Sequence, residues 1–461
     1  MDFAFILLVL NFAIVFASND DLIGSLPGLT EPIKFKQYSG YLTARPGRHH
    51  FYWFVESETD PANAPVVLWL TGGPGCSSVF GMLTENGPFH VNSDGKTVAL
   101  NTHSWNKVAN VIYMESPVST GFSYEDNQLI PYNTDVSTAE DNYLALESFF
   151  VKYPHLKKNP FYIVGESYGG VYVPMLSLEI FKRNSTINFK GAGVGNSLLD
   201  GNLLSGQHMY DFALGHGLIT TDYYEKKIEN CCEFKSGPQH QCDFDEHLNN
   251  TKCQSVPVQS VSTPNPYNIY DDCFPDLYYQ TIFNKFYKER FERIGLKFPI
   301  GESLKLNGPE KLNCPHDGHS KYLNIEEVRK ALHVKEGSIK WVGCGGAYDR
   351  QKGYTPQHEN VLQLVNKYSL GKFVVYNGDF DIMCDFISDS RFVDNLELKK
   401  TDTYKQWTND GTKDGDIGGF VQHYEKGVSF VLVRGAGHMV PQDKPEAGLQ
   451  VFKYILGLTK L

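Results

Sequence analysis

The sequence predicts an α/β fold, in which strands and helices alternate around a largely parallel sheet. Short apolar runs alternate with helix-like segments along most of the chain, and this order is typical of parallel strands joined by helical crossovers. Several apolar runs lead directly into glycine-rich turns. A cysteine-rich segment, residues 198–320, interrupts the pattern and divides the predicted core into residues 18–197 and 321–461.

Within the first part of the core, apolar or alternating runs predict strands. These runs are residues 50–55, 65–70, 109–114, 161–164 and 191–194. A helix is expected to begin near Ser137, because Glu140 stands at the capping-box position that follows it. Pro154 should end that helix.

The second part of the core continues the alternation. A helix is expected from Asn324, with Glu327 at its capping-box position. Residues 373–376 and 429–433 are predicted strands. Pro441 is expected to open a last helix that runs to about Leu456, because proline is tolerated in a first helical turn.

Composition excludes several classes of protein. Of the 461 residues, 41% are hydrophobic and 21% are charged, an ordinary globular balance that argues against long disorder. Lysine and arginine number 42 against 53 aspartates and glutamates, a formal charge of −11, so a nucleic-acid partner is not expected. A mean hydropathy of −0.33 excludes a protein with many membrane spans.

The amino terminus resembles a secretory signal. Residues 3–17 are almost wholly apolar, about the length of a signal-peptide core and short for a membrane span. We expect residues 1–17 to be removed, leaving no membrane span; an uncleaved N-terminal anchor helix is the alternative. Sequons at Asn184 and Asn249 agree with the secretory pathway, and the expected location is secreted or lysosomal.

Ser167 is the predicted nucleophile. It is the central residue of Gly165-Glu166-Ser167-Tyr168-Gly169, which fits G-x-S-x-G, and it lies between an apolar strand and a helix-like segment. In an α/β-hydrolase fold this context forms a sharp turn that exposes the serine hydroxyl. The alternative is a serine that only caps a helix.

A serine nucleophile needs a general base and an orienting carboxylate, which follow it in that fold in the order serine, acid, histidine. His438 lies in a glycine-rich loop after the predicted strand 429–433. Asp379 and Asp381 both follow the strand 373–376, and spacing alone does not choose between them. A glycine-rich loop at Gly72 and Gly73 could direct backbone N–H groups at an oxyanion.

Together these motifs resemble the serine carboxypeptidase family, and they occur in the family's order. They are residues 68–78, 115–124, 165–170, 377–381 and 435–441. The resemblance implies that Ser167, Asp381 and His438 form the catalytic triad. It also implies that the backbone amides of Gly73 and Tyr168 form the oxyanion hole.

The resemblance further implies how a peptide's C-terminal carboxylate is bound. The binding residues would be Thr71, Gly72, Glu85 and Glu166. Two neighbouring carboxyls cannot both ionise cheaply, so a protonated Glu166 could donate a hydrogen bond to the substrate, and activity should be best in acid. The family usually has asparagine at position 71, and Thr71 leaves open an esterase or acyltransferase that uses the same triad.

Nine cysteines are present, an odd number. The resemblance implies the pairs Cys76–Cys344, Cys231–Cys253, Cys232–Cys242 and Cys273–Cys314. Cys384 would then be the free thiol, either inert or lining the site. The resemblance also suggests that residues 274–313 form a loop that is excised on maturation, with a solvated helix as the alternative.

No metal or organic cofactor is expected, since His316 and His319 alone are too few for a zinc site. The expected partners are peptide substrates with a free C-terminus, and the family suggests a homodimer. A different class of function is a protective partner of lysosomal glycosidases, which would not need Ser167. Side-chain preference at the last two substrate positions cannot be inferred from the sequence.

Overall fold

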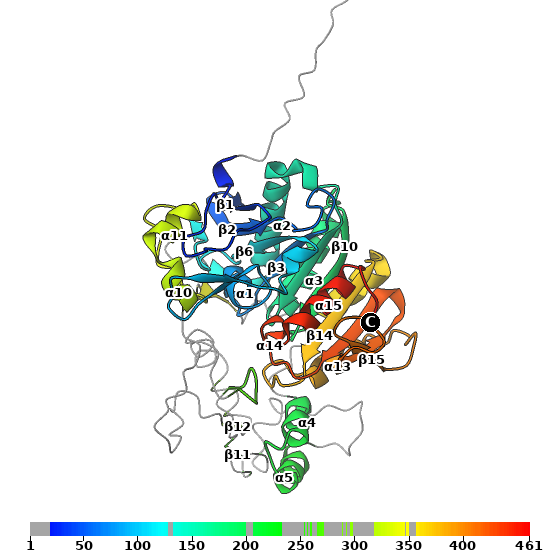
Figure 1. Ribbon diagram of the computed structural model, residues 1–461. Coiled ribbons are helices and arrows are strands. Elements are labelled where there is room, and N and C mark those ends of the chain that lie inside the picture. The colour runs from blue at the N-terminus through cyan, green and yellow to red at the C-terminus, as the bar shows by residue number, and fades with distance from the viewer. Residues whose placement is uncertain are drawn as a thin grey trace, which may run out of the picture.

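The computed structural model (Figure 1) describes most of the two core segments and part of the segment between them. The described residues are 19–127, 132–199, 206–232, 253, 256, 259–260, 265–271, 288, 292, 296–297, 318–345, 347–349 and 356–461. The expected signal peptide, Asn249 and the pair Cys273–Cys314 lie outside them.

The centre of the described chain is an 11-stranded mixed sheet. In spatial order its strands are β1 (Gln37–Thr43), β2 (Arg48–Val55), β6 (Asn110–Met114), β3 (Val66–Leu70), β9 (Phe161–Glu166), β10 (Phe189–Gly195), β14 (Lys372–Gly378), β17 (Val428–Val433), β16 (Ile417–His423) and β15 (Lys405–Thr408), with β7 (Tyr124–Glu125) against β2. The strands from β6 to β17 are parallel, and those at both edges are antiparallel.

Helices and short ribbons complete the described structure. The helices are η1 (Asn19–Asp21), α1 (Ser78–Thr84), η2 (Trp105–Lys107), α2 (Asp135–Lys152), η3 (Pro154–Leu156), α3 (Gly169–Lys182), α4 (Gln207–Gly215), α5 (Thr221–Cys231), α10 (Gly318–Leu323), α11 (Glu326–Ala331), α12 (His358–Leu362), η5 (Gln363–Lys367), α13 (Phe386–Asn395), η6 (Glu425–Gly427), α14 (Val440–Asp443) and α15 (Pro445–Ile455). The ribbons are β4 (Phe89–Val91) with β5 (Val98–Leu100), β8 (Tyr132–Asn133) with β13 (Ala347–Tyr348), and β11 (Gln259–Ser260) with β12 (Leu296–Lys297).

The sheet is covered on both faces, which explains its apolar strands. In β3, Leu68 packs into the cluster that contains α2 and α3, whereas Trp69 packs into the cluster that contains α1 and α15. Neighbouring side chains of a strand point to opposite faces, so a strand buried on both faces is apolar throughout. All five residues of β3 are buried accordingly.

The runs predicted as central strands are confirmed as β2, β3, β6, β9, β10, β14 and β17. The long helix predicted to begin near Ser137 is confirmed as α2, but its N-cap is Thr134 rather than Ser137. The helix begins at Asp135, because Thr134 accepts a hydrogen bond from the Ser137 N–H and Ser137 Oγ accepts one from the Thr134 N–H.

Two other predicted helices differ from the structure in detail. Asn324 does not cap α11; its side chain donates to the carbonyls of Ser320 and Trp341 instead, and Ile325 precedes the helix. The last helix begins at Val440, beside Pro441 as expected, but it is divided into α14 and α15, since Lys444 leaves the helical region with φ −134° and ψ 70° and Pro445 begins the second part. A residue before proline is disfavoured in the helical region.

The described part of the segment 198–320 includes α4 and α5, which lie together at one end of the core (Figure 1). A disulfide joins Cys231 at the end of α5 to Cys253, and Phe212 of α4 contacts Phe386 of α13. Among the described helices, none is both long and apolar enough to cross a membrane.

Candidate active site

The candidate active site lies where the parallel strands end. The loops after β3, β9, β10, β14 and β17 carry Thr71, Ser167, Asn196, Asp381 and His438 respectively. Parallel strands place their carboxyl ends at one edge of the sheet, where sites of this architecture form. A pocket there is lined by Thr71, Gly72, Gly73, Cys76, Glu166, Ser167, Leu198, Tyr267, Met383, Cys384 and His438.

Ser167 occupies a tight turn between β9 and α3. Its φ of 60° lies in the left-handed region, which is costly for a residue with a side chain. Hydrogen bonds hold the turn, from the Ser167 N–H to the Gly195 carbonyl and from the Leu198 N–H to the Ser167 carbonyl. The neighbouring loop approaches closely because Gly72 has no side chain: a Cβ there would lie 2.2 Å from the Tyr168 nitrogen.

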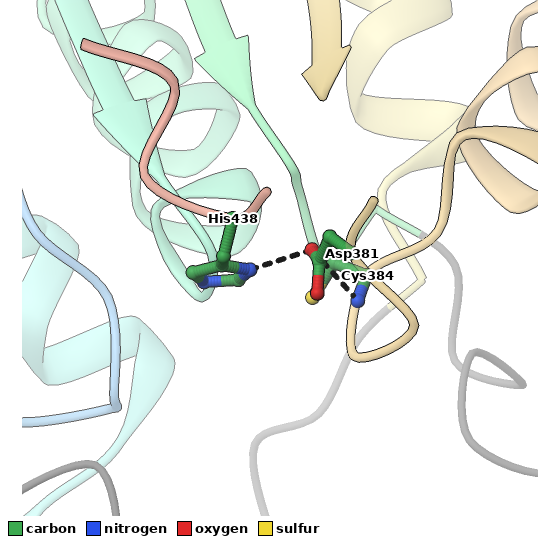
Figure 2. Close-up of side chains that lie close together, drawn as sticks. All are labelled: Asp381, Cys384 and His438. Atoms are coloured by element: carbon green, nitrogen blue, oxygen red, sulfur yellow. Dashed lines mark hydrogen bonds and ion pairs between the residues drawn. The ribbon is translucent and has the colours of Figure 1, made fainter. Parts of the chain in front are cut away.

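His438 and Asp381 form a buried pair beside this turn (Figure 2). The His438 Nδ1 lies 2.7 Å from an Asp381 carboxylate oxygen. The other ring nitrogen, Nε2, is buried in the pocket and has no hydrogen-bond partner among the described residues. Of the two aspartates that spacing left open, Asp379 instead accepts from the Gly435 N–H, so only Asp381 contacts His438.

Asn196 is a site residue that the sequence reasoning missed. Its amide donates at 3.0 Å to the same Asp381 oxygen that faces His438, and its carbonyl oxygen accepts from the Gly378 N–H. The N–H groups of Met383 and Cys384 also donate to the Asp381 carboxylate. Asn196 follows β10 directly, so the rule that selected Asp381 and His438, a polar residue just after a parallel strand, could have selected it too.

The glycine-rich loop is held against α3 and against a distant segment. The hydroxyl of Tyr172 accepts from the Gly75 N–H at 3.2 Å. Cys76 forms a disulfide with Cys344, 268 positions later in the chain. The loop therefore lies against the turn at Ser167, and its residue Gly73 lines the pocket together with Ser167.

Glu85 and Glu166 are both buried next to the pocket. Burial raises the pKa of Glu85 to about 7. Burial, together with the negative charge of Glu85, raises the pKa of Glu166 well above its usual range. At least one of the two is therefore protonated in acid and able to donate a hydrogen bond.

Thr71 lines the same pocket as Glu166 and Ser167. Its hydroxyl accepts a hydrogen bond from the Trp69 indole at 2.9 Å, which leaves the hydroxyl proton available for donation. A Cβ placed on Gly81 would lie 3.0 Å from the Thr71 hydroxyl and 3.2 Å from Glu85 Oε1. The hydroxyl and the carboxyl thus face the same small space.

Comparison with known proteins identifies the family. A family model described as serine carboxypeptidase matches residues 27–457. The chain belongs to the serine carboxypeptidase family. It is 38% identical over 458 residues to the lysosomal protective protein of Mus musculus, covering 95% of this chain and 94% of that protein. It is 36% identical over 452 residues to a serine carboxypeptidase of Caenorhabditis elegans, covering 94% of this chain and 93% of that protein.

A solved structure agrees on the fold. The prohormone-processing carboxypeptidase of Saccharomyces cerevisiae superposes with a TM-score of 0.70 at 22% identity, covering 96% of both chains. The α/β-hydrolase fold expected from the sequence is confirmed. As a member of its family, the chain is a serine-type carboxypeptidase and therefore a hydrolase.

Most of the described cysteines of this carboxypeptidase form disulfides, and Cys384 is a free thiol. Cys232 is also disulfide-bonded, but Cys242, its expected partner, lies outside the described residues. Cys384 is free and buried, and it lines the pocket. Burial and the nearby Asp381 charge raise the pKa of the Cys384 thiol well above its usual range, which keeps it protonated. Asn184, one of the sequon residues, is exposed after the end of α3.

Proposed function

We propose that this serine carboxypeptidase releases C-terminal amino acids from peptides through an acyl-enzyme on Ser167. One observation carries the proposal. His438 is hydrogen-bonded through Nδ1 to Asp381, and its Nε2, which has no partner among the described residues, faces the pocket. Ser167 lines the same pocket and occupies a strained turn. A nucleophile, a base and an orienting acid in this relation are the requirements of acyl transfer.

The reaction would begin when His438 Nε2 takes the Ser167 hydroxyl proton. The Ser167 oxygen bonds to the carbonyl carbon of the last peptide bond, and the N–H groups of Gly73 and Tyr168 stabilise the resulting oxyanion. The carbon–nitrogen bond then breaks, and His438 passes its proton to the leaving amine. Water, deprotonated by His438, hydrolyses the acyl-enzyme and restores the Ser167 hydroxyl.

The carboxyl-terminal specificity would come from Glu85, Glu166, Thr71 and the Gly72 backbone. A protonated Glu166, supported by the Thr71 hydroxyl, can donate to a substrate carboxylate. The raised pKa of the two glutamates determines the sign of the pH effect. Below the raised pKa the pair is largely neutral and binds the carboxylate; above it the pair gains negative charge and repels it, so the reaction is favoured in acid.

We also infer the setting of the enzyme. The apolar amino terminus, the disulfides and the exposed sequon at Asn184 support synthesis through the secretory pathway. Similarity to a protein named lysosomal supports an acidic destination. The segment 198–320 would be an insertion placed over the active-site edge, stabilised further by the pairs Cys232–Cys242 and Cys273–Cys314.

A test uses peptides with a free C-terminus, each paired with its C-terminally amidated twin. Purified protein is incubated with both sets at about pH 5 and about pH 7.5, values that straddle the raised carboxyl pKa, and the products are read by mass spectrometry. We expect loss of single C-terminal residues, fastest in acid and from the free acids only. Ser167→Ala is the control and should abolish the cleavage.

The opposite result has a defined meaning. If neither set is trimmed by protein whose Ser167 still reacts with an active-site phosphonate, the peptidase proposal is wrong. Ester substrates without a free carboxylate would then be tried, because a hydroxyl at Thr71 offers fewer donors to a carboxylate than an amide does. If free-acid and amidated peptides are shortened equally, the peptidase proposal stands, and only the assignment of Glu85 and Glu166 to carboxylate binding is wrong.

A further inference from the structure

A buried carboxylate behind the candidate oxyanion hole has no role in the reaction described above. Asp135 is the first residue of α2 and is 1% exposed. Its Oδ1 accepts two hydrogen bonds, from the Tyr168 hydroxyl at 2.9 Å and from the Tyr348 hydroxyl at 2.6 Å. Asp135 does not cap its helix, because Thr134 and Ser137 do so.

We propose that Asp135 is a positioning residue, which acts through the Tyr168 side chain to hold the Tyr168 backbone N–H in place for the oxyanion. The inference rests on the proposed function, since it assumes that this N–H is an oxyanion donor. It goes beyond that function by assigning a task to a side chain outside the pocket.

The geometry of Tyr168 supports this role. Its backbone follows Ser167 directly and is the N-cap of α3, whereas its hydroxyl reaches Asp135 of α2, a separate element. Its ring does not line the pocket; it packs against Tyr172 at 5.3 Å and against Tyr348 at 5.7 Å between ring centroids. The side chain therefore connects the amide at the turn to a fixed point on another helix.

The same cluster of tyrosines also holds the second oxyanion loop. The Tyr172 hydroxyl accepts from the Gly75 N–H, and the Tyr172 ring packs against the Tyr168 ring. The loop that carries Gly73 and the residue Tyr168 therefore both contact Tyr172. An oxyanion hole needs such fixed placement, because a displacement of about 1 Å can cost about 100-fold in rate.

The chemistry of the cluster is consistent with a permanent anchor. A buried carboxylate is costly unless it is hydrogen-bonded, and two hydroxyl donors satisfy Asp135 Oδ1. Burial raises the pKa of Tyr348 above its usual range, so its hydroxyl remains a donor at neutral and acid pH. The anchor should therefore operate throughout the pH range in which the enzyme works.

The test compares two variants, each of which removes one of the two tyrosine hydroxyls that donate to Asp135 Oδ1. Tyr168→Phe breaks the link to the oxyanion donor, whereas Tyr348→Phe removes an equivalent hydroxyl whose backbone lies elsewhere. We expect Tyr168→Phe to lower kcat for a peptide about tenfold, as loss of one charge-assisted hydrogen bond would, with KM nearly unchanged. Tyr348→Phe should lower the melting temperature similarly but reduce kcat much less.

A second readout separates positioning from general stability. An N-blocked peptide aldehyde forms a hemiacetal with Ser167, and the former aldehyde oxygen enters the oxyanion hole. The affinity of the enzyme for this aldehyde should therefore fall together with kcat in Tyr168→Phe. Asp135→Asn keeps an acceptor oxygen and should retain most of the activity, whereas Asp135→Ala should resemble Tyr168→Phe.

The inference is overturned if Tyr168→Phe and Tyr348→Phe lose stability and kcat in equal proportion, or if Tyr168→Phe leaves kcat and aldehyde affinity unchanged. If Asp135→Ala does not fold, the comparison of Tyr168→Phe with Tyr348→Phe still tests the inference. These outcomes differ from failure of the proposed function, in which the wild-type protein itself would not trim peptides.

Discussion

Two buried histidine–aspartate pairs occur within one small region, and only one of them lies in the pocket. His438 Nδ1 contacts Asp381 at 2.7 Å, and His208 Nδ1 contacts Asp385 at 2.6 Å. All four side chains are almost completely buried. Burial and a short contact therefore do not distinguish a candidate catalytic pair from a structural one.

The surroundings of each pair make the distinction. Asp381 also accepts from Asn196 and from two backbone N–H groups, and its histidine lines the pocket with Ser167. Asp385 caps α13 through the Ser388 N–H, and His208 comes from α4. The second pair thus joins α4 to α13, and the elements that each histidine faces determine what the pair can do.

The largest expected effect is on catalysis by the first pair. Asp381→Asn should lower kcat about 10⁴-fold, since an asparagine in this position favours the wrong tautomer of the histidine. The same change at the second pair, Asp385→Asn, should leave kcat within about threefold, a loss below 1 kcal/mol. Steady-state kinetics on one peptide measure both, and comparable losses of kcat would end the distinction between the pairs.

The second pair should matter for stability instead. His208→Leu leaves the Asp385 charge buried without its histidine and should destabilise the fold by about 3–5 kcal/mol. Adding Asp385→Ser, which retains a helix cap, should recover part of this loss. Denaturant unfolding of the single and double variants gives the values. A double variant less stable than His208→Leu would contradict a stabilising contact between His208 and the Asp385 carboxylate.

A smaller effect is expected from the side chain that supports Asp381. Asn196→Ala removes a donor to the charged carboxylate and should lower kcat about 10-fold to 100-fold, from a loss of about 1.5–3 kcal/mol. Asn377→Ala is a matched control, because Asn377 donates to Asp389 and to the Cys384 carbonyl rather than to Asp381. If both alanines lower kcat equally, Asn196 contributes only to packing.

The smallest expected effect is on KM, and it comes from the ionisation of Glu85 near the first pair. The raised pKa of Glu85, about 7, means that the carboxyl is neutral at pH 5.5 and mostly ionised at pH 8. KM for a free-acid peptide should therefore rise about tenfold between these values, or about 1.4 kcal/mol, while KM for an ester changes less. Glu85→Gln stays neutral and should flatten the profile. An unchanged slope in this variant would remove Glu85 from carboxylate binding.

The sequence predicted those parts of the fold that obey local rules. The central strands of the sheet are apolar because both faces are covered, so their positions were visible as unbroken runs. The turn at Ser167 was visible because glycines must flank it. The strands β15 and β16 were not expected, because they lie toward the sheet edge and alternate less clearly between apolar and polar residues.

Helix starts and supporting residues were harder to predict for a physical reason. Thr134 and Ser137 both suit a cap, and packing of the whole helix selects between them. Asn196, Asp135 and Asp385 depend on partners that are distant in sequence. Asn196 meets Asp381 across 185 positions, and His208 meets Asp385 across 177 positions. A local pattern could mark Asn196 as a candidate site residue, but it could not indicate which side chain either residue contacts.

The disulfide between Cys76 and Cys344 has a topological consequence. It closes a covalent ring that contains Ser167 and the whole segment 198–320, while Asp381 and His438 lie on the tail beyond it. A protease that cut anywhere within residues 274–313 would open the ring without separating the two fragments. The polypeptide could thus be delivered as one chain and used as two, with the proposed nucleophile Ser167 on one fragment and the proposed base His438 on the other.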